Sequence, residues 1–266
     1  MREILVVKVG GSLLDWAGLP AALDGLVREL QDREEDQPRL GPADEVSACE
    51  CEPSTPALPH KGGGSPMGGG GQSEEMERGN GRSFSWGAPM RLVFVVGGGL
   101  AADFVRELDR VHRLGDEVSH GLALHALDLS AEALASLVPG LEVVETLEEL
   151  PAVWDSGGCP VLAPRRVLEA EERARPREAL EHSWDVTSDT ISARLAQLIG
   201  ASGLLLLKSV GVPEGTDLES ASARGLVDSA FPGEAADLPG VWVRNLRDPR
   251  GGLTRLTLKR LESRPF

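Results

Sequence analysis

The chain has 266 residues, of which 41% are hydrophobic, and carries a formal net charge of −15. This length suffices for one large α/β domain or two small ones. A nucleic-acid-binding surface needs a basic footprint, so the acidic charge argues against that class of protein. An anionic ligand would have to be held by a few focused donors. We find neither a signal peptide nor an apolar run long enough to span a bilayer, and we expect a soluble cytoplasmic protein without a membrane partner.

The numbers and positions of the cysteines and lysines indicate which kinds of site the chain could contain. The three cysteines, Cys49, Cys51 and Cys159, are odd in number, which argues against a disulfide framework. The Cys-x-Cys pair lacks further ligands at metal-binding spacing. Only four of the 27 basic residues are lysines, and two of these, Lys8 and Lys208, end apolar runs. Lysines so placed are candidates for a function inside a site.

The N-terminal part of the chain predicts a strand, a turn and a helix. Residues 4–7 form a short β-branched run typical of a buried parallel strand. Lys8 and the sequence Gly10-Gly11-Ser12 follow as strand end and turn. Pro20 suits the first turn of a helix. The apolar stripe of that helix consists of Leu23, Leu26, Val27 and Leu30.

Residues 31–89 interrupt this pattern with acidic, proline-rich and glycine-rich segments. Such a composition buries too little apolar surface to offset the entropy of ordering the chain. We interpret it as a disordered low-complexity insertion within a single domain that spans residues 1–266. Residues 91–96 then look like the partner strand of residues 4–7.

The remainder alternates helices with strands. Gly97-Gly98-Gly99 opens a helix with Leu100, Phe104, Leu108 and Val111 on one stripe. Further helices are predicted over residues 116–137, 146–154 and 169–175, and after residue 188, where Ile191, Leu195, Leu198 and Ile199 form the apolar face. Further strands are predicted over residues 141–144, 160–163, 203–208, 241–243 and 253–258. This alternation predicts an α/β fold with a mainly parallel central sheet sandwiched between helices.

Two glycine clusters, Gly10-Gly11 and Gly97-Gly98-Gly99, each stand between a predicted strand and a helical segment. Backbone N–H groups at such junctions can bind anions, although either cluster alone could be only a tight turn. Neither cluster fits the P-loop fingerprint, and the dinucleotide fingerprint is weak. Lys8 lies two residues before Gly10, within reach of an anion held there. Phosphoryl transfer depends on such positioning and charge neutralisation.

The densest polar cluster is His182-Ser183-Trp184-Asp185-Val186-Thr187-Ser188-Asp189. Thr187 or Ser188 suits an N-cap, which would place Asp189 in the first helical turn. A helix cap with a dipole-matched acid would explain Asp189 alone, but not the polar residues before it. A carboxylate here could orient two lysines or bind a substrate cation. Three histidines on predicted helices, His112, His120 and His125, have no acidic partner at metal spacing and are expected in the core or on the surface.

Together these motifs resemble the amino acid kinase superfamily. The opening Lys8-Val9-Gly10-Gly11-Ser12 resembles its first-strand motif, Val95 to Gly99 its substrate-side glycine loop, and Thr187-Ser188-Asp189 its Asp-containing catalytic motif. The segment 182–189 is moreover similar to the HSW-x-x-TSD signature of a subgroup, the (aminomethyl)furanylmethyl phosphate kinases of methanofuran biosynthesis. Residues 118–123 and 226–232 also resemble segments of that subgroup.

The resemblance implies an ATP-dependent kinase that uses Mg²⁺ as Mg–ATP, without a metal site built from protein ligands. Its acceptor would be a small phosphomonoester carrying an amine, and we expect a homo-oligomer, dimer or higher. Lys8, Asp189 and Lys208 would be catalytic. Residues expected at the nucleotide phosphates are Gly10, Gly11, Ser12, Lys208 and Gly211. Residues expected at the acceptor are Gly97, Gly98, Gly99, His182, Trp184, Asp185 and Thr187.

One departure from the superfamily pattern stands after the strand that ends at Lys208. Many members carry a Thr/Ser-Asp-Val-Asp/Ser-Gly sequence there, whereas this chain has Lys208-Ser209-Val210-Gly211-Val212. The lysine is either a relocated phosphate ligand or a sign of altered nucleotide handling. Other acceptors remain open, namely isopentenyl phosphate, UMP or a carboxylate such as acetylglutamate or aspartate. A non-catalytic nucleotide-binding sensor remains open as well.

Overall fold

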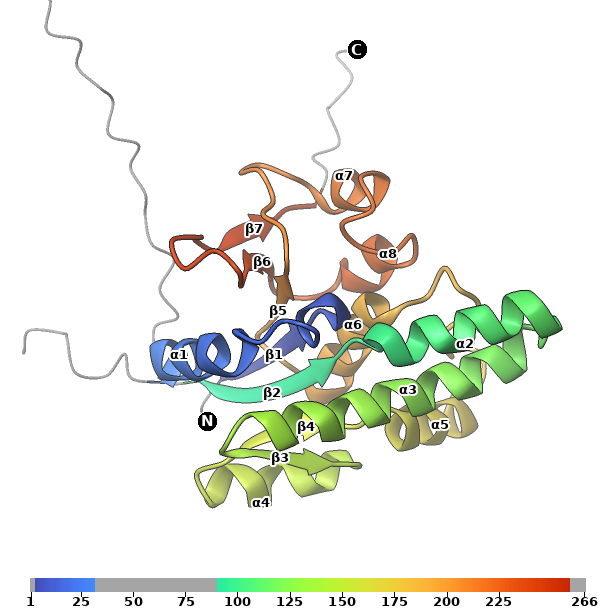
Figure 1. Ribbon diagram of the computed structural model, residues 1–266, viewed down its shortest axis with the longest axis horizontal. Coiled ribbons are helices and arrows are strands. Elements are labelled where there is room, and N and C mark those ends of the chain that lie inside the picture. Colours follow the sequence, from blue (N-terminus) through green and yellow to red (C-terminus); the bar gives the residue numbers. More distant parts are fainter. Residues whose placement is uncertain (1–2, 32–89, 259–266) are drawn as a thin grey trace, which may run out of the picture. The chain divides into compact units, whose positions relative to one another are not determined.

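The computed structural model describes residues 3–31 and 90–258 (Figure 1). The strands are β1 (Ile4–Val9), β2 (Arg91–Val96), β3 (Leu141–Val144), β4 (Cys159–Leu162), β5 (Gly203–Lys208), β6 (Val241–Asn245) and β7 (Thr254–Leu256). The α-helices are α1 (Leu19–Gln31), α2 (Gly99–His112), α3 (Asp116–Leu137), α4 (Leu150–Asp155), α5 (Arg165–Ala174), α6 (Ser188–Ile199), α7 (Leu218–Ala223) and α8 (Phe231–Ala235). Two short 3-10 helices, η1 (Gly11–Leu13) and η2 (Leu147–Glu149), complete them.

The strands form one sheet in the order β3-β4-β2-β1-β5-β6-β7. All pairs are parallel except β6 with β7, which are antiparallel. The central strand β1 lies between β2 and β5, with Lys8 opposite Val95 on one side and Leu206 on the other. The carboxyl ends of these three strands therefore lie side by side, and ligands of open α/β sheets bind at such an edge.

Helices cover both faces of the sheet and create two apolar layers. Leu5, Val7 and Val9 of β1 belong to the layer beneath α1 and the second half of α3. Val6 belongs to the opposite layer, together with residues of α4, α5, α6, α7 and α8. Because side chains alternate along a strand, Lys8 faces the same side as Val6, toward α6. The predicted α/β fold, a mainly parallel sheet between helices, is confirmed.

The face by which α2 packs was predicted incorrectly. The expected apolar stripe is largely exposed, with Leu100 at 77% and Phe104 at 64% of their full accessibility. The buried side of α2 consists instead of Ala102 and Val105. Small residues fit there because α2 and α3 form an antiparallel hairpin, in which Ala102 and Val105 share an apolar cluster with Ala126.

Several boundaries also differ from the prediction. The charged helix begins at Arg165, four residues earlier than expected, and the predicted helix over 146–154 is divided into η2 and α4. The short helices α7 and α8 were not predicted. The predicted insertion lies outside the described residues apart from Gln31, which ends α1, and a single domain over 1–266 stays a prediction. Within the described ranges, no helix is long and apolar enough to cross a membrane.

Candidate active site

The two glycine loops after β1 and β2 are in backbone contact with each other. A Cβ at Gly11 would lie 2.4 Å from the backbone nitrogen of Gly99, and one at Gly97 would lie 2.7 Å from the backbone nitrogen of Gly11. Gly99 also has a positive φ of 50°. Larger residues at these positions would force the loops apart, so the contact itself requires glycine. The two clusters, 85 residues or more apart in sequence, thus form one floor.

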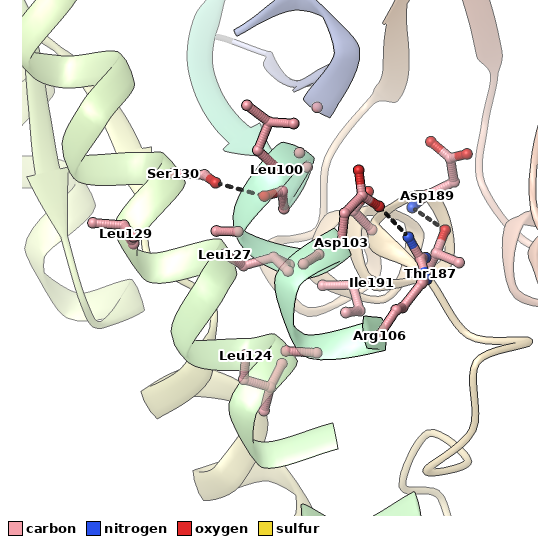
Figure 2. A pocket seen from close by; sticks show the side chains of 18 of the residues that line it. Leu100, Asp103, Arg106, Leu124, Leu127, Leu129, Ser130, Thr187, Asp189 and Ile191 are labelled. Carbon is pink, nitrogen blue, oxygen red and sulfur yellow. Dashed lines mark hydrogen bonds and ion pairs between the residues drawn. The ribbon is translucent and has the colours of Figure 1, made fainter. Parts of the chain in front are cut away.

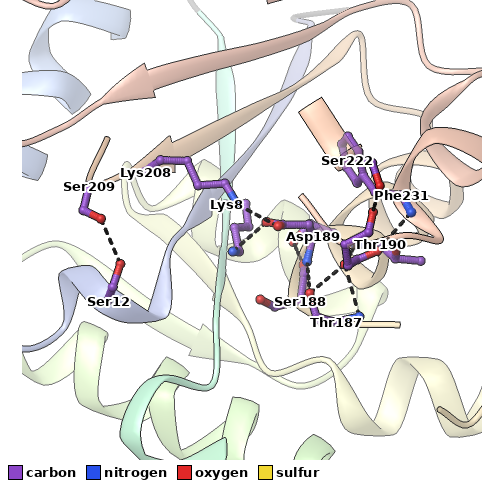
Figure 3. Close-up of polar contacts among 12 residues, drawn as sticks. Lys8, Ser12, Thr187, Ser188, Asp189, Thr190, Lys208, Ser209, Ser222 and Phe231 are labelled. Atoms are coloured by element: carbon purple, nitrogen blue, oxygen red, sulfur yellow. Dashed lines mark hydrogen bonds and ion pairs between the residues drawn. The ribbon is translucent and has the colours of Figure 1, made fainter. Parts of the chain in front are cut away.

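Lys8, Asp189 and Lys208 meet beside this floor (Figure 3). Lys8 Nζ lies 2.7 Å from Asp189 Oδ1, and Lys208 Nζ lies 2.6 Å from Asp189 Oδ2. Both lysines leave neighbouring strands at their carboxyl ends and face α6, whose first turn carries Asp189. We call these three residues the lysine–aspartate triad. It places two ammonium groups on one carboxylate, which leaves one net positive charge.

Burial determines how this triad is charged. Burial by itself would raise the pKa of Asp189, but the charges of Lys8 and Lys208 outweigh it and hold that pKa below its usual value. Burial and the neighbouring charge of Lys8 lower the pKa of Lys208 to about 8, against the opposing attraction of Asp189. Asp189 therefore stays ionised at neutral pH, whereas Lys208 is close to losing its proton.

The start of α6 is held by Asp228, which the sequence did not single out as a site residue. Asp228 Oδ2 accepts hydrogen bonds from Thr187 Oγ1 at 2.6 Å, from the Thr187 backbone N–H at 3.1 Å and from the Thr190 backbone N–H at 3.1 Å. Asp228 Oδ1 accepts from Thr190 Oγ1 and, at 3.0 Å, from the Phe231 backbone N–H. Thr187 is the N-cap of α6, and its Oγ1 accepts from the Asp189 backbone N–H. Asp228 thereby fixes the helix turn that presents Asp189.

A cavity of about 560 Å³ begins at the triad and extends between the α2–α3 hairpin and residues 183–191 (Figure 2). Its first end contains Lys8, Asp189, the two glycine loops and Ser130, whose Oγ donates to the Gly98 carbonyl at 3.3 Å. Its middle is apolar, with Leu124, Leu127 and Ile191. A small ligand with one anionic end and an apolar body would match these surroundings.

The other end of the cavity is polar and is built around Trp184. The indole Nε1 of Trp184 donates to Asp109 Oδ2 at 3.0 Å, and the guanidinium of Arg106 lies 4.8 Å from the ring centroid. Arg106 also pairs with Asp103 at 2.9 Å. The hydrogen bond from Trp184 lowers the pKa of Asp109, with smaller contributions from the Gly115 backbone N–H and Ser119. The Trp184 ring is therefore held in place as a wall of the cavity.

A stacked histidine pair holds the loop before Trp184 against α3. The rings of His120 and His182 are parallel within 11°, with centroids 3.9 Å apart. His182 Nδ1 lies 3.0 Å from Glu117 Oε2, and His182 Nε2 lies 3.6 Å from Glu172 Oε2. Burial, together with His182, lowers the pKa of His120. Of the two histidines, only His120 lines the cavity.

The structure brings most of the predicted site residues together, but not all of them. The cavity is lined by Lys8, Gly11, Ser12, Gly97, Gly98, Gly99, Trp184, Thr187 and Asp189. Lys208 reaches the cavity only through its ion pair with Asp189, and Gly10 is held at the strand end, where its N–H donates to the Leu207 carbonyl at 2.9 Å. Gly211 and Asp185 are exposed and lie outside the cavity, as does His182.

Further polar residues of the cavity were not predicted as site residues, in particular Arg106, Asp116 and Ser119. Ser119 and Asp228 lie in residues 118–123 and 226–232, so the similarity of these segments to the phosphate kinases was the one signal that could have found them. Across residues 3–31 and 90–258, no group of three or more His, Cys, Asp or Glu side chains is placed to hold a metal ion.

Comparison with known proteins adds one relative in sequence. The chain is 29% identical over 152 residues to the [5-(aminomethyl)furan-3-yl]methyl phosphate kinase of Methanocaldococcus jannaschii, a match that covers 53% of this chain and 67% of the relative. No protein-family model matches the sequence.

Solved structures add a likeness in fold. The uridylate kinase of Archaeoglobus fulgidus superposes with a TM-score of 0.50 at 14% identity, covering 97% of this chain and all of that one. The UMP kinase of Ureaplasma parvum gives a TM-score of 0.49 at 10% identity, with the same coverage of both chains. The resemblance to the amino acid kinase family that the motifs predicted is thereby confirmed, in sequence by the phosphate kinase and in fold by the uridylate kinase of Archaeoglobus fulgidus.

Proposed function

We propose that the chain is an ATP-dependent kinase that phosphorylates a small phosphomonoester, with [5-(aminomethyl)furan-3-yl]methyl phosphate as the acceptor. The observation that carries the proposal is the lysine–aspartate triad, placed where two glycine loops meet at one end of the cavity. The named relative supports the choice of acceptor, because its printed activity is that of this phosphate kinase.

In the proposed reaction an oxygen of the acceptor phosphate attacks the γ-phosphorus of ATP. The bond from the γ-phosphorus to the β–γ bridging oxygen breaks, ADP leaves, and the product is a diphosphate ester. No proton has to be removed from the acceptor when its phosphate is fully ionised. The main requirement is therefore to neutralise the negative charge of the two reacting phosphate groups. In phosphoryl transfer this is done by cations held in fixed positions.

In this proposal Lys8 and Lys208 supply positive charge to the transferring group. Asp189 holds both ammonium groups in fixed positions, so that little reorganisation is needed during the reaction. Backbone N–H groups of the loop Gly97 to Gly99, at the start of α2, would hold the acceptor phosphate. Mg²⁺ would enter with ATP and neutralise charge on the triphosphate, since both oxygens of Asp189 already face lysines.

The walls of the cavity suit an acceptor with a flat apolar body. Leu124, Leu127 and Ile191 line its middle, and the Trp184 ring stands at its far end. A furan ring between these residues would leave water while its phosphate stayed at the triad. A nucleoside would additionally need partners for its base and sugar hydroxyls.

The proposal is tested by measuring ADP release with a panel of acceptors. The panel comprises [5-(aminomethyl)furan-3-yl]methyl phosphate, isopentenyl phosphate, UMP, acetylglutamate and aspartate. We expect turnover with the first compound at a kcat/KM at least about tenfold above the others. Turnover with a different compound of the panel would support the kinase activity but show that the proposed acceptor is wrong. ATP binding without turnover on any acceptor would favour a nucleotide sensor and contradict the proposal.

A further inference from the structure

Two buried hydroxyls at the far end of the cavity make no well-formed hydrogen bond to the described part of the chain. Ser119 is 1% exposed and Ser183 is partly buried, and both line the cavity. Neither Oγ makes a hydrogen bond of good geometry to any described residue, although Ser119 is near enough to Asp109 to help lower its pKa. Buried polar atoms are nearly always paired, because an unpaired one costs about 1–3 kcal/mol. Two such atoms in one cavity indicate a missing polar ligand group.

The contacts around these serines show that they belong to the same end. The rings of His120 and His182 stack, and the residues that follow or precede them in sequence, Ser183 and Ser119, both line the cavity. The other end is marked by Ser130, which bonds to the glycine loop. Ser119 and Ser130 are eleven residues apart on α3, so they lie roughly 16 Å apart along the helix axis. The two serines therefore lie at the end of the cavity opposite Ser130.

The charged side chains at this end of the cavity indicate which kind of polar group would bind to the two serines. Asp116 lines this end, Asp109 lies beside Trp184, and Glu117 contacts His182. The cation here, Arg106, is already paired with Asp103. The surplus is negative, and carboxylates only accept hydrogen bonds, whereas a serine hydroxyl can accept or donate. A group that donates several hydrogen bonds and carries positive charge meets all of these requirements.

We propose that Ser119 and Ser183, with the carboxylate of Asp116 beside them, form a subsite for a primary ammonium group on the acceptor. This inference rests on the proposed function and adds specificity residues to it. The acceptor is then bipolar, with its phosphate at the triad, its apolar body beside Leu124 and Ile191, and its ammonium group at the serines. An ammonium group supplies three donors, enough for both hydroxyls and a carboxylate.

The test compares two acceptors that differ only in the amine, namely [5-(aminomethyl)furan-3-yl]methyl phosphate and (5-methylfuran-3-yl)methyl phosphate. The readout is the ratio of their kcat/KM values in the full chain and in Ser119→Ala and Ser183→Ala. A hydrogen bond to a charged group corresponds to about 10- to 100-fold in affinity. We expect a ratio of at least about tenfold in the unaltered chain, reduced about tenfold in either variant, mainly through KM.

The matched control is Ser136→Ala on the same helix. Ser136 is exposed, donates to the Glu132 carbonyl at 2.8 Å and lies outside the cavity. Its substitution should leave the acceptor ratio unchanged. Equal use of both acceptors by the unaltered chain, or an unchanged ratio in both serine variants, overturns the subsite.

Calorimetric titration of the ATP-free protein with the same two compounds separates this inference from the proposed function. If neither compound is phosphorylated, the proposed kinase activity fails. The subsite is still supported if the amine-bearing compound binds at least about tenfold more tightly and Ser119→Ala removes the difference. It is overturned if the two compounds bind equally.

Discussion

Asp189 is the residue on which both lysines depend. Its side chain is 7% exposed and lies within 2.7 Å of Lys8 and 2.6 Å of Lys208. Such a buried charge is tolerated only because it is paired. With one carboxylate and two ammonium groups, the triad keeps a net positive charge in an otherwise acidic protein.

Loss of Lys8 should therefore impair turnover more than folding. We expect Lys8→Ala to lower kcat by about 10²- to 10³-fold, as for the removal of one preorganised donor. Asp189 keeps Lys208 as its partner, so the variant should still fold, which its melting curve would show. The control is Arg166→Ala, which removes an exposed cation paired with Glu145 and should leave kcat unchanged. Full turnover by Lys8→Ala would remove Lys8 from the mechanism.

We expect Lys208 to make the proposed reaction sensitive to alkaline pH. Its pKa of about 8 means that its positive charge is lost as pH rises through that value. If the charge contributes to phosphoryl transfer, kcat/KM for ATP should fall above about pH 8, because this parameter reports the free enzyme. Lys208→Arg should retain some activity and lose this fall, since arginine stays protonated. A profile that is flat to pH 10 in the unaltered chain would contradict the role of Lys208.

A residue of this site could be predicted when its interaction partners are close to it in the sequence. Thr187 as N-cap and Asp189 in the first turn follow from the three adjacent residues 187–189, and Lys8 was indicated by the glycines that follow it. Asp228 acts on Thr187 and Thr190 from 38 residues or more away, and no local pattern indicates that pairing. Asp185 illustrates the converse, because a polar residue inside a motif can still point to solvent.

Among the elements, the loops after β1 and β2 depend on the absence of side chains. Gly11 approaches Gly99 so closely that even one methyl group would overlap its backbone. We expect Gly11→Ala to reduce the free energy of unfolding by about 1–3 kcal/mol and to lower turnover as well. The matched control is Gly25→Ala in α1, where no atom lies within 4 Å of the added Cβ. There alanine should stabilise the protein by up to about 1 kcal/mol.

Urea unfolding of both variants checks this pair of changes. Equal stability of Gly11→Ala and the unaltered chain would mean that the loops can separate without cost, which contradicts their described contact.

The helices and strands were predictable where hydrophobic periodicity has one interpretation. β1, β2 and β5 are short apolar runs, and α6 shows a clear cap and apolar face. For α2 the periodicity identified a helix but the wrong buried side. Which side packs depends on α3, through the small contacts of Ala102 and Ala126, and not on the hydrophobicity of α2 alone. The five- and six-residue helices α8 and α7 are too short to produce a periodic signal.

For the molecule as a whole, the described residues supply every group of the proposed site. All of them lie before α1 or after β2, and β1 pairs directly with β2 along six residues. Deletion of residues 40–85 should therefore leave kcat within about fivefold, since a shorter connection changes the entropy of loop closure only modestly. Acceptor-dependent ADP release by the shortened protein checks this. Failure of the shortened protein to fold would contradict the interpretation of residues 31–89 as an insertion.

The most direct test of phosphoryl transfer at the lysine–aspartate triad is phosphorus NMR of the reaction with ATP, Mg²⁺ and [5-(aminomethyl)furan-3-yl]methyl phosphate. Besides the resonances of ADP, we predict a new pair of mutually coupled resonances from a diphosphate ester. Lys8→Ala should reduce their rate of appearance by about 10²- to 10³-fold. Release of inorganic phosphate without these resonances, or their undiminished formation by Lys8→Ala, would contradict the proposed transfer at this site.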